Sequence, residues 1–184
     1  MTVTLDAGIR LLSGSLFDYN DPDKSAVTIE DIACALSNVC RFAGHLPQFY
    51  SVAQHAINTS RIVDAGNAYA ALLHDTAEAF TNDLPTPLKH AVPVFKQLEE
   101  SIEASMSRRF GFQYPLSDAV RLADLQMLAL EKVHIKRDLS PWSVLEGIEY
   151  EHLKGLVDLR PMAPCRAKAL FLERYADLHS KVPA

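Results

Sequence analysis

The chain has 184 residues, of which 48% are hydrophobic and 22% are charged, a composition typical of one globular domain of ordinary size. Its formal net charge is −5, with Lys and Arg scattered along the sequence, which argues against nucleic acid as an obligatory partner and fits a small anionic substrate. No apolar run reaches the ~18 residues of a membrane span. The N-terminus also lacks a signal-peptide pattern, so the sequence predicts a cytoplasmic protein without a membrane partner.

Two predicted helices follow the N-terminal segment. Thr28 and Asp31 have the spacing of a capping box, and apolar residues then recur at helical spacing up to about Cys40. A second helix is expected from about Phe49 to Asp64, with Gly66 as its stop, because a residue without a Cβ can adopt a left-handed cap. Two consecutive helices therefore open the predicted bundle.

Four further helices are predicted, over residues 68–80, 94–110, 117–137 and 164–179. Asn67 can cap the first of these, which should end where two closely spaced prolines remove backbone donors. Gly111 is the expected stop of the second, and Pro164 suits the first turn of the last. Helices thus account for most of the chain.

Strand patterns are weak throughout, because alternating runs of β-branched residues are short and isolated. The chain has no internal repeat and no linker rich in Gly, Ser or Pro, so the expected fold is all-α, a helical bundle in a single domain. Residues 1–27 contain turn-forming residues and paired acids, and they are expected to form an irregular N-terminal arm of the same domain. The functional domain is assigned to residues 28–184.

Metal-ligating residue types stand out among the apolar residues. His74 and Asp75 are adjacent in the apolar stretch ALLHDTAEAF. Burial of an imidazole and a carboxylate without partners is costly, and a metal ion satisfies both. A hydrogen-bonded core histidine beside a capping aspartate fits this dipeptide equally well.

Two more residues favour the metal. His55 lies 19 residues before His74 on the expected packed face of the preceding helix, and Asp124 lies 49 residues after Asp75 in the apolar stretch RLADLQMLAL. Ligands from three helices can converge in the core of a bundle. Two imidazoles and two carboxylates suit Zn, Co, Mn or Fe and do not suit a thiolate site. The sequence therefore predicts one divalent metal held by His55, His74, Asp75 and Asp124.

The order of these residues resembles a known enzyme family. A His, an HD pair and a distant Asp form the pattern of the HD-domain phosphohydrolases, and the strings RFAGHLPQFYSVAQH and LLHDTAEAFTNDLPTPLK are similar to the YfbR-like 5′-nucleotidase branch. The similarity covers residues 28–131. Within this branch the chain is most similar to the bacteriophage dATP triphosphohydrolases (DatZ), which share a lysine and a basic residue where Lys89 and Arg121 stand. The resemblance implies an HD-domain helical bundle.

Glu78 is the candidate catalytic residue. It follows His74 by four residues and Asp75 by three, so helical geometry places it on the same face as this pair, one turn along. The resemblance implies that Glu78 is the general acid/base beside a metal-activated water. The alternative for this residue is a solvated surface glutamate.

Five residues are candidate substrate contacts: Arg41, Phe42, Asp83, Lys89 and Arg121. Arg121 precedes Asp124 by three residues and should share its helix face, so its guanidinium can point into the site. The resemblance implies that Arg41 and Lys89 contact phosphate, Phe42 the nucleobase and Asp83 the sugar. Ordinary surface cations are the alternative for Lys89 and Arg121, and an Asn-Asp turn is the alternative for Asp83.

The expected reaction is hydrolysis of a deoxynucleoside triphosphate, dATP first, to deoxynucleoside and triphosphate by metal-activated water. Three candidate phosphate cations favour this highly charged substrate over the alternative, a 5′-nucleotidase that releases phosphate from deoxynucleoside 5′-monophosphates. An alternative from another class is an inactive metal-binding HD regulatory module, which would have no need of Glu78. Zn, Co or Mn is the expected metal, with additional Mg accompanying a triphosphate. The resemblance also implies a homo-oligomer, in the host cytoplasm for a phage protein.

Overall fold

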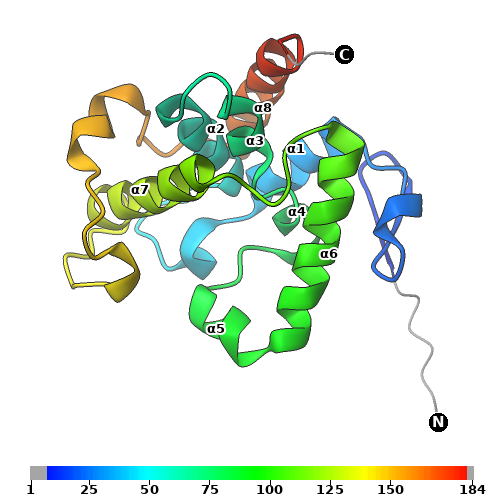
Figure 1. The fold of residues 1–184 in the computed structure, drawn as a ribbon, viewed down its shortest axis with the longest axis horizontal. Helices are drawn as coiled ribbons and strands as arrows, with labels where there is room; N and C mark the ends of the chain where they lie inside the picture. Colours follow the sequence, from blue (N-terminus) through cyan, green and yellow to red (C-terminus); the bar gives the residue numbers. More distant parts are fainter. Residues whose placement is uncertain (1–7, 182–184) are drawn as a thin grey trace.

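Helices dominate the structure, a computed structural model that describes residues 8–181 (Figure 1). The α-helices in this range are α1 (Ile29–Asn38), α2 (Val52–Ile62), α3 (Ala68–Leu73), α4 (Glu78–Thr81), α5 (Thr86–Ala91), α6 (Pro93–Phe110), α7 (Asp118–His134) and α8 (Pro164–His179). The predicted all-α class is confirmed. Across the described part of the chain, no helix combines the length and hydropathy that crossing a membrane requires.

Several helix ends follow the signals in the sequence. The Thr28 hydroxyl accepts a hydrogen bond from the Asp31 backbone N–H, and the Asp31 carboxylate accepts one from the Thr28 N–H, which completes the predicted capping box. Ser117 caps α7 with its side chain. Gly111 ends α6 in the left-handed conformation, and α8 begins at Pro164 as predicted.

The single helix predicted over residues 68–80 is broken in the structure. α3 ends at Leu73 and α4 begins at Glu78, with a turn between them in which the Glu78 N–H donates to the Asp75 carbonyl. The sequence analysis also did not predict α5, which has Pro87 in its first turn, where a missing N–H leaves no hydrogen bond unmade. The expected proline stop is therefore wrong for α4, which ends just before Asn82, a residue with a φ of 63°, whereas the prolines begin α5.

α2 is shorter than predicted. It begins after Ser51, whose side chain accepts from a backbone N–H of the first turn, and it ends at Ile62. The expected left-handed cap at Gly66 is wrong, because the Asp64 side chain instead accepts the N–H groups of Gly66 and Asn67 in a tight turn. Asn67 precedes α3 but makes no capping hydrogen bond with its side chain. α7 likewise stops short of its predicted end.

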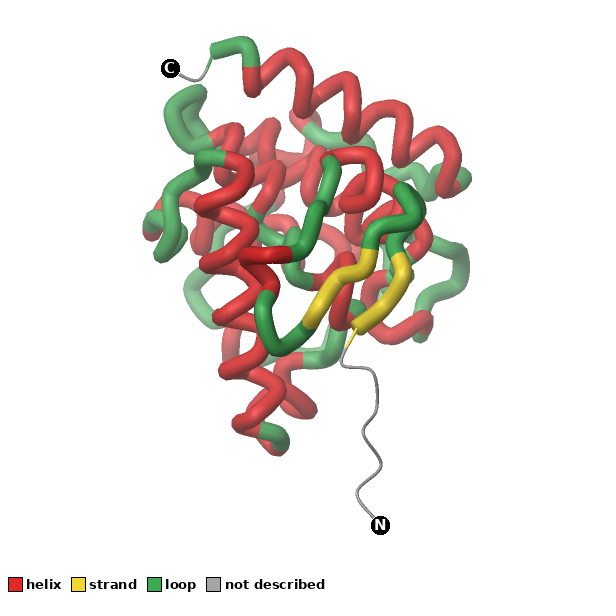
Figure 2. Tube along the Cα trace, turned by 90° about the vertical axis from the view of Figure 1, so that its right-hand side faces the viewer, coloured by secondary structure: helices red, strands yellow, loops and turns green. Residues whose placement is uncertain are grey.

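The N-terminal arm contains a hairpin that the sequence analysis did not predict. Strand β1 (Gly8–Arg10) pairs antiparallel with β2 (Leu16–Asp18), on the outside of the helical bundle in Figure 2. Phe17 is fully buried and stacks on Phe80 of α4, with ring centroids 3.8 Å apart, so the arm packs into the common core. The expectation of an irregular arm is wrong for this hairpin, and the first seven residues lie outside the described residues.

α2 lies at the centre of the bundle. Its residues from Val52 to Ser60 are all buried, and it contacts α1, α3, α7 and α8. α3 also packs against α7, while α5 packs against α6 on another side of the molecule (Figure 1). The buried middle of α2, the end of α3 and the inner face of α7 therefore meet, and the segment of α4 and α5 borders this meeting point.

Candidate active site

The four predicted metal ligands lie together where α2, the turn after α3 and α7 meet. The Nε2 atoms of His55 and His74 are 3.3 Å apart. Asp124 Oδ1 lies 3.1 Å from the first of these nitrogens and 3.7 Å from the second. Asp75 Oδ1 lies 3.3 Å from His74 Nε2, and Asp75 Oδ2 lies 3.7 Å from His55 Nε2. The ligand atoms of His55, His74 and Asp124 thus all lie within 4.8 Å of one another, and Asp75 lies against both histidines.

The hydrogen bonds behind these ligands fit a bound cation. His55 Nδ1 lies 2.7 Å from Glu131 Oε1, and His74 Nδ1 lies 2.7 Å from the Ala71 carbonyl oxygen. An acceptor at each Nδ1 requires a proton there, so each neutral ring directs the lone pair of its Nε2 toward the other. Asp75 Oδ2 is buried without a hydrogen-bond partner. A divalent metal among these atoms would satisfy all of them.

Ionisable groups at this point favour positive charge. Burial and Arg41 oppose protonation of His55, but the Glu131 and Asp124 carboxylates outweigh them and raise its pKa to about 10. The pKa of His74 is also raised against burial, by Asp75 and Asp124. Despite burial, the two imidazoles hold the pKa of Asp124 well below its usual range. The donor set therefore stabilises a cation here, whether protons or a metal.

Glu78 begins α4 and faces the cavity. Its side chain is only 5% exposed, so a solvated surface glutamate does not describe it. Oε1 lies 3.5 Å from Lys89 Nζ, and Oε2 is buried without a hydrogen-bond partner. Burial, together with the Asp75 and Asp83 carboxylates, raises the pKa of Glu78 well above its ordinary value. Such a carboxyl can take up and release a proton under conditions in which ordinary carboxylates stay ionised.

Lys89 lies on α5 and is held by carboxylates. Its Nζ donates to Glu99 Oε1 at 2.7 Å and lies 3.5 Å from Glu78 Oε1. Although burial opposes protonation, these two carboxylates keep the pKa of Lys89 above its ordinary value. Glu99, which the sequence analysis did not single out, is buried on α6. The charge of Lys89 is therefore already balanced by two acidic side chains.

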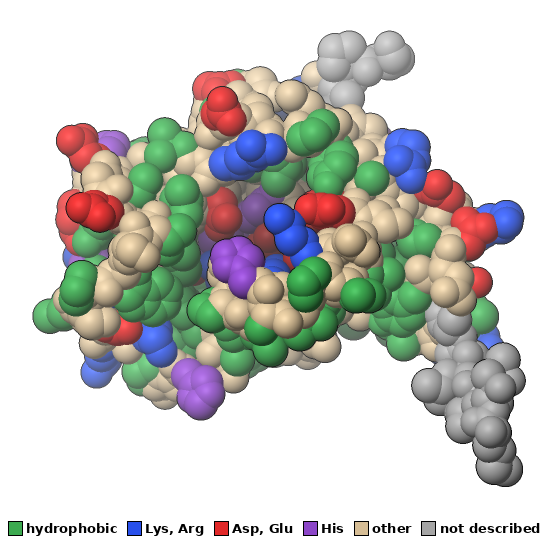
Figure 3. All heavy atoms as spheres, turned by 60° about the horizontal axis from the view of Figure 1, so that its bottom comes forward, with side chains coloured by type: hydrophobic (Ala, Val, Ile, Leu, Met, Phe, Trp, Pro, Cys, Tyr) green, Lys and Arg blue, Asp and Glu red, His purple; other side chains and the backbone are tan. Residues whose placement is uncertain are grey.

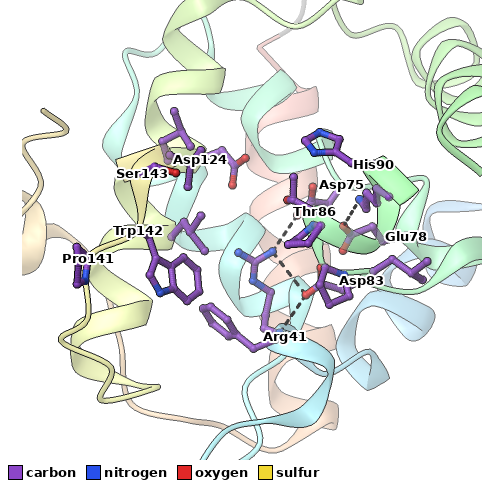
Figure 4. Close-up of a pocket in the computed structure, with 18 residues that line it drawn as sticks. Arg41, Asp75, Glu78, Asp83, Thr86, His90, Asp124, Pro141, Trp142 and Ser143 are labelled. Carbon is purple, nitrogen blue, oxygen red and sulfur yellow. Dashed lines mark hydrogen bonds and ion pairs between the residues drawn. The ribbon is translucent and has the colours of Figure 1, made fainter. Parts of the chain in front are cut away.

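Arg41 and Phe42 lie on a short 3-10 turn, Arg41–Gly44, with a strained backbone. Phe42 and Ala43 have φ angles of 56° and 50°, in the left-handed region that residues with a Cβ rarely adopt. Asp83 Oδ2 accepts the Phe42 N–H at 3.2 Å and lies 3.8 Å from Arg41 Nη1. Asp83 therefore stabilises this turn while it lines the cavity (Figure 4).

Glu131 connects Arg41 to the cluster of histidines. Its Oε2 accepts from Nε and Nη2 of Arg41 at 3.3 and 3.1 Å, while its Oε1 contacts His55. Glu131 is fully buried and follows Asp124 on α7 by seven residues, which is two helical turns. That spacing, with an acidic residue inside LQMLALEK, was the signal that could have identified it in the sequence.

Arg121 is the predicted contact that the structure does not bring into the site. Its side chain is 59% exposed and lies 3.8 Å from Asp118 Oδ1, and it does not line the cavity. Asp124 points inward from the next turn of α7, whereas the longer Arg121 side chain follows the solvent-facing side. A separation of three residues brings two side chains near one another on a helix, but it does not fix the direction of a long flexible one.

The cluster opens into a cavity of about 810 Å³. Charged side chains gather around a hollow in this face of the molecule (Figure 3). The charged residues of the lining include Arg41, Asp75, Glu78, Asp83, Lys89 and Asp124, whereas a second part is apolar and includes Phe42, Leu125, Leu128, Pro141, Trp142 and Val144. Its volume suits a ligand the size of a nucleotide.

Trp142 and Phe42 form the aromatic part of the lining. Their ring centroids are 6.3 Å apart in an edge-to-face arrangement, and Lys132 Nζ lies 5.3 Å from the Trp142 centroid. Figure 4 shows Trp142 and Glu78 on opposite sides of Arg41. Trp142 was not predicted from the sequence, because it lies in an irregular segment after α7 where periodicity gives no information.

Known proteins are similar to this chain over most of its length. A family model described as 5′-deoxynucleotidase YfbR-like matches residues 38–117, a range that contains Arg41, His55, the His74–Asp75 pair and Glu78. The chain is 44% identical to the uncharacterized protein YfdR of Escherichia coli, over 92% of this chain and 94% of the relative. An uncharacterized protein of Rhodobacter capsulatus is 33% identical, over 68% and 71% of the two chains.

One similar protein has an activity in its name. A protein of Pasteurella multocida called a 5′-deoxynucleotidase is 34% identical over 46% of this chain and 43% of its own length. The description of the family and the name of this relative both state the activity of a 5′-deoxynucleotidase. The comparisons therefore favour the 5′-nucleotidase alternative over the expected dATP triphosphohydrolase.

Proposed function

We propose that the chain is a metal-dependent 5′-deoxynucleotidase. The premise is that it belongs to the YfbR-like 5′-deoxynucleotidase family of the HD superfamily. In this proposal it releases phosphate from deoxynucleoside 5′-monophosphates. The observation that carries the proposal is the cavity bordered by the predicted metal-binding cluster, by the buried carboxyl of Glu78 and by an apolar aromatic wall. The three features match the metal, the proton transfer and the base of such a reaction.

The charges of the cavity support a monophosphate as the substrate. The prediction of a triphosphate substrate assumed three cations that are free to bind phosphate. Arg121, however, lies outside the cavity, and Lys89 is paired with Glu78 and Glu99. Arg41 donates hydrogen bonds from Nε and Nη2 to Glu131. What remains for a phosphate is a metal and Arg41 Nη1, with the His90 imidazole also in the lining. These can balance a dianionic phosphate and leave the greater charge of a triphosphate uncompensated.

The side chains around the cavity have distinct proposed roles. A divalent metal held by His55, His74, Asp75 and Asp124 would polarise the phosphate and activate a water for attack. Glu78 transfers a proton at its carboxyl, which its raised pKa suits. Arg41 Nη1, which makes no hydrogen bond of its own, orients the phosphate.

The nucleoside end of the substrate is assigned to the apolar wall. Phe42 and Trp142 provide aromatic surface for a base, and Figure 4 shows Trp142 across Arg41 from Glu78. Asp83, between the two ends, stays our candidate for the sugar, although its Oδ2 already accepts the Phe42 N–H. The arrangement places the base at a distance from the metal, as a 5′-phosphate substrate requires.

The decisive experiment is a hydrolysis panel of deoxynucleoside mono-, di- and triphosphates with Mn²⁺, Co²⁺ or Zn²⁺. Chromatography distinguishes phosphate from triphosphate release. The expected products are deoxynucleoside and phosphate from the monophosphates, with Glu78→Gln purified in parallel to exclude a contaminating phosphatase. Release of triphosphate would instead establish a triphosphohydrolase, and absence of turnover by a metal-loaded protein would leave the inactive regulatory module.

Three further expectations belong to this proposal. The resident metal is expected to be Zn, Co or Mn, which elemental analysis of the purified protein identifies. A homo-oligomer is expected from the family and is measured by light scattering. The cytoplasm is the expected location, because it holds the nucleotide pool, and fractionation with a tagged chain tests this.

A further inference from the structure

We propose that Glu131 is a positioning residue that couples the metal cluster to the phosphate-orienting Arg41, an inference that rests on the proposed function. One of its carboxylate oxygens faces His55 and the other faces Arg41. Oε1 lies 2.7 Å from His55 Nδ1, and Oε2 lies 3.1 Å from Arg41 Nη2 and 3.3 Å from Arg41 Nε. A single side chain therefore contacts both a proposed metal ligand and a proposed phosphate ligand.

The burial of Glu131 makes its orientation specific. The side chain is fully buried, and Arg41 and His55 are 8% and 0% exposed. A buried carboxylate needs compensation by charge and hydrogen bonds, which these two partners provide. Because each oxygen has its own partner, rotation of the carboxylate would break contacts on both sides. Glu131 is consequently held in one orientation and holds its partners in turn.

On the histidine side, Glu131 determines which ring nitrogen is available to a metal. A carboxylate at Nδ1 retains a proton there, and the lone pair then lies on Nε2, the atom that faces His74 and Asp124. Such a carboxylate also makes the imidazole a better donor. Loss of an outer carboxylate of this kind weakens metal binding by about 10- to 100-fold.

On the arginine side, Glu131 fixes the plane of the guanidinium. Nε and Nη2 are both directed at Oε2, which leaves Nη1 toward the cavity, 3.9 Å from Asp75 Oδ2 and 3.8 Å from Asp83 Oδ2. Without this contact the guanidinium would turn toward Asp75 and Asp83, which lie on the cavity side. Phosphate binding would then weaken even with metal present.

The test compares Glu131→Gln with the parent in metal binding as well as in catalysis. The amide has the size of the carboxylate, but its NH₂ group faces either the Arg41 donors, where the contact is lost, or His55 Nδ1, where the hydrogen bond is reversed and the ring proton moves to Nε2. Where the NH₂ group faces His55, isothermal titration with Mn²⁺ should show a Kd raised about 10- to 100-fold. Where it faces Arg41, steady-state kinetics with a deoxynucleoside monophosphate at saturating metal should show a raised KM.

A matched control is available on the surface. Glu151 makes the same type of contact, with Oε1 3.0 Å from His134 Nε2, but it is exposed and distant from the cavity lining. Glu151→Gln should therefore leave the Mn²⁺ Kd and the KM unchanged. Equal Mn²⁺ affinity and equal KM in Glu131→Gln and the parent would overturn the inference. A parent that binds no metal would instead contradict the proposed function.

A second measurement does not depend on the folding of a variant. Nitrogen-15 NMR of the Zn²⁺-loaded parent distinguishes a histidine with its proton on Nδ1 from one with its proton on Nε2. We expect His55 to carry a proton on Nδ1, shifted by a short hydrogen bond to a carboxylate. The opposite tautomer would overturn the inference even where Glu131→Gln fails to fold.

Discussion

Replacement of Glu78 by Gln should remove most turnover while leaving the fold and the metal cluster in place. The amide keeps the volume of a side chain that is only 5% exposed, but it cannot exchange a proton. Glu78 is not one of the four proposed ligands, so the metal should stay bound. General acid–base catalysis by one residue typically contributes about 10²- to 10⁴-fold, or ~3–5 kcal/mol of activation free energy, and kcat should fall by this factor.

The same substitution should stabilise the metal-free protein. Burial, with Asp75 and Asp83 nearby, raises the pKa of Glu78 above 4.5, so the native state favours the neutral carboxyl. For a carboxyl with a raised folded-state pKa, this stabilisation is complete below the unfolded pKa and is lost as the pH rises through the folded pKa. Gln has no carboxyl that can ionise, so the variant does not lose this stabilisation. The free energy of unfolding of the variant should therefore match the parent near pH 4 and exceed it at pH 8.

Three measurements test this reasoning together. They are kcat with a deoxynucleoside monophosphate, metal content by elemental analysis, and calorimetric unfolding from pH 4 to pH 8 with a chelator. Glu100→Gln is the control, since Glu100 is 53% exposed on α6, where it pairs with Lys96. A variant with nearly parental kcat would remove Glu78 from the reaction. A variant that loses the metal would make Glu78 a ligand instead.

Three other substitutions test the rest of the site and its surroundings. Asp124→Asn should lose metal and activity together, because an amide is a weaker ligand, and undiminished metal content would show that Asp124 is not the fourth ligand. Trp142→Ala should raise KM about 5-fold or more with kcat largely kept, since base stacking on an aromatic ring is worth ~1–3 kcal/mol, whereas an unchanged KM would place the base elsewhere. Burial, with Glu99 and Asp75, raises the pKa of Glu103 to about 7, so Glu103→Gln should gain ~1–2 kcal/mol of stability at pH 8 in chelated protein and nothing at pH 4. Thermal unfolding measures that gain as a rise of about 2–8 °C, and equal midpoints at pH 8 would contradict it.

The sequence predicted the long helices well, because their ends depend on local chemistry. Thr28, Gly111 and Pro164 act through hydrogen bonds or backbone angles within a few residues, which a linear pattern contains. The break after Leu73 and the pairing of two three-residue strands depend on tertiary packing. Phe17, for example, is buried against a ring that is distant in the sequence, and no local pattern indicates such a contact.

The residues of the site also divide into those with a local signal in the sequence and those without one. His55 and Asp124 were detectable because each is a polar residue within an apolar helical stretch, where burial needs a reason. Glu131 had the same signal but was not linked to a motif. Trp142 had none, because it lies in an irregular segment. Arg121 was predicted from spacing alone, and spacing does not reveal which partner a long cationic side chain chooses.

Cation pairing, more than cation number, determines what this cavity can bind. Lys89 compensates Glu78 and Glu99, and Arg41 compensates Glu131, so both cations already stabilise buried acidic groups. A ligand that drew either cation away would leave a buried carboxylate without its cationic partner, which costs free energy. Under the proposed function, phosphate recognition would therefore come mainly from the metal and from Arg41 Nη1, which Glu131 does not engage. Such a site fits a single phosphate group, and this is the physical reason to expect the monophosphate before the triphosphate.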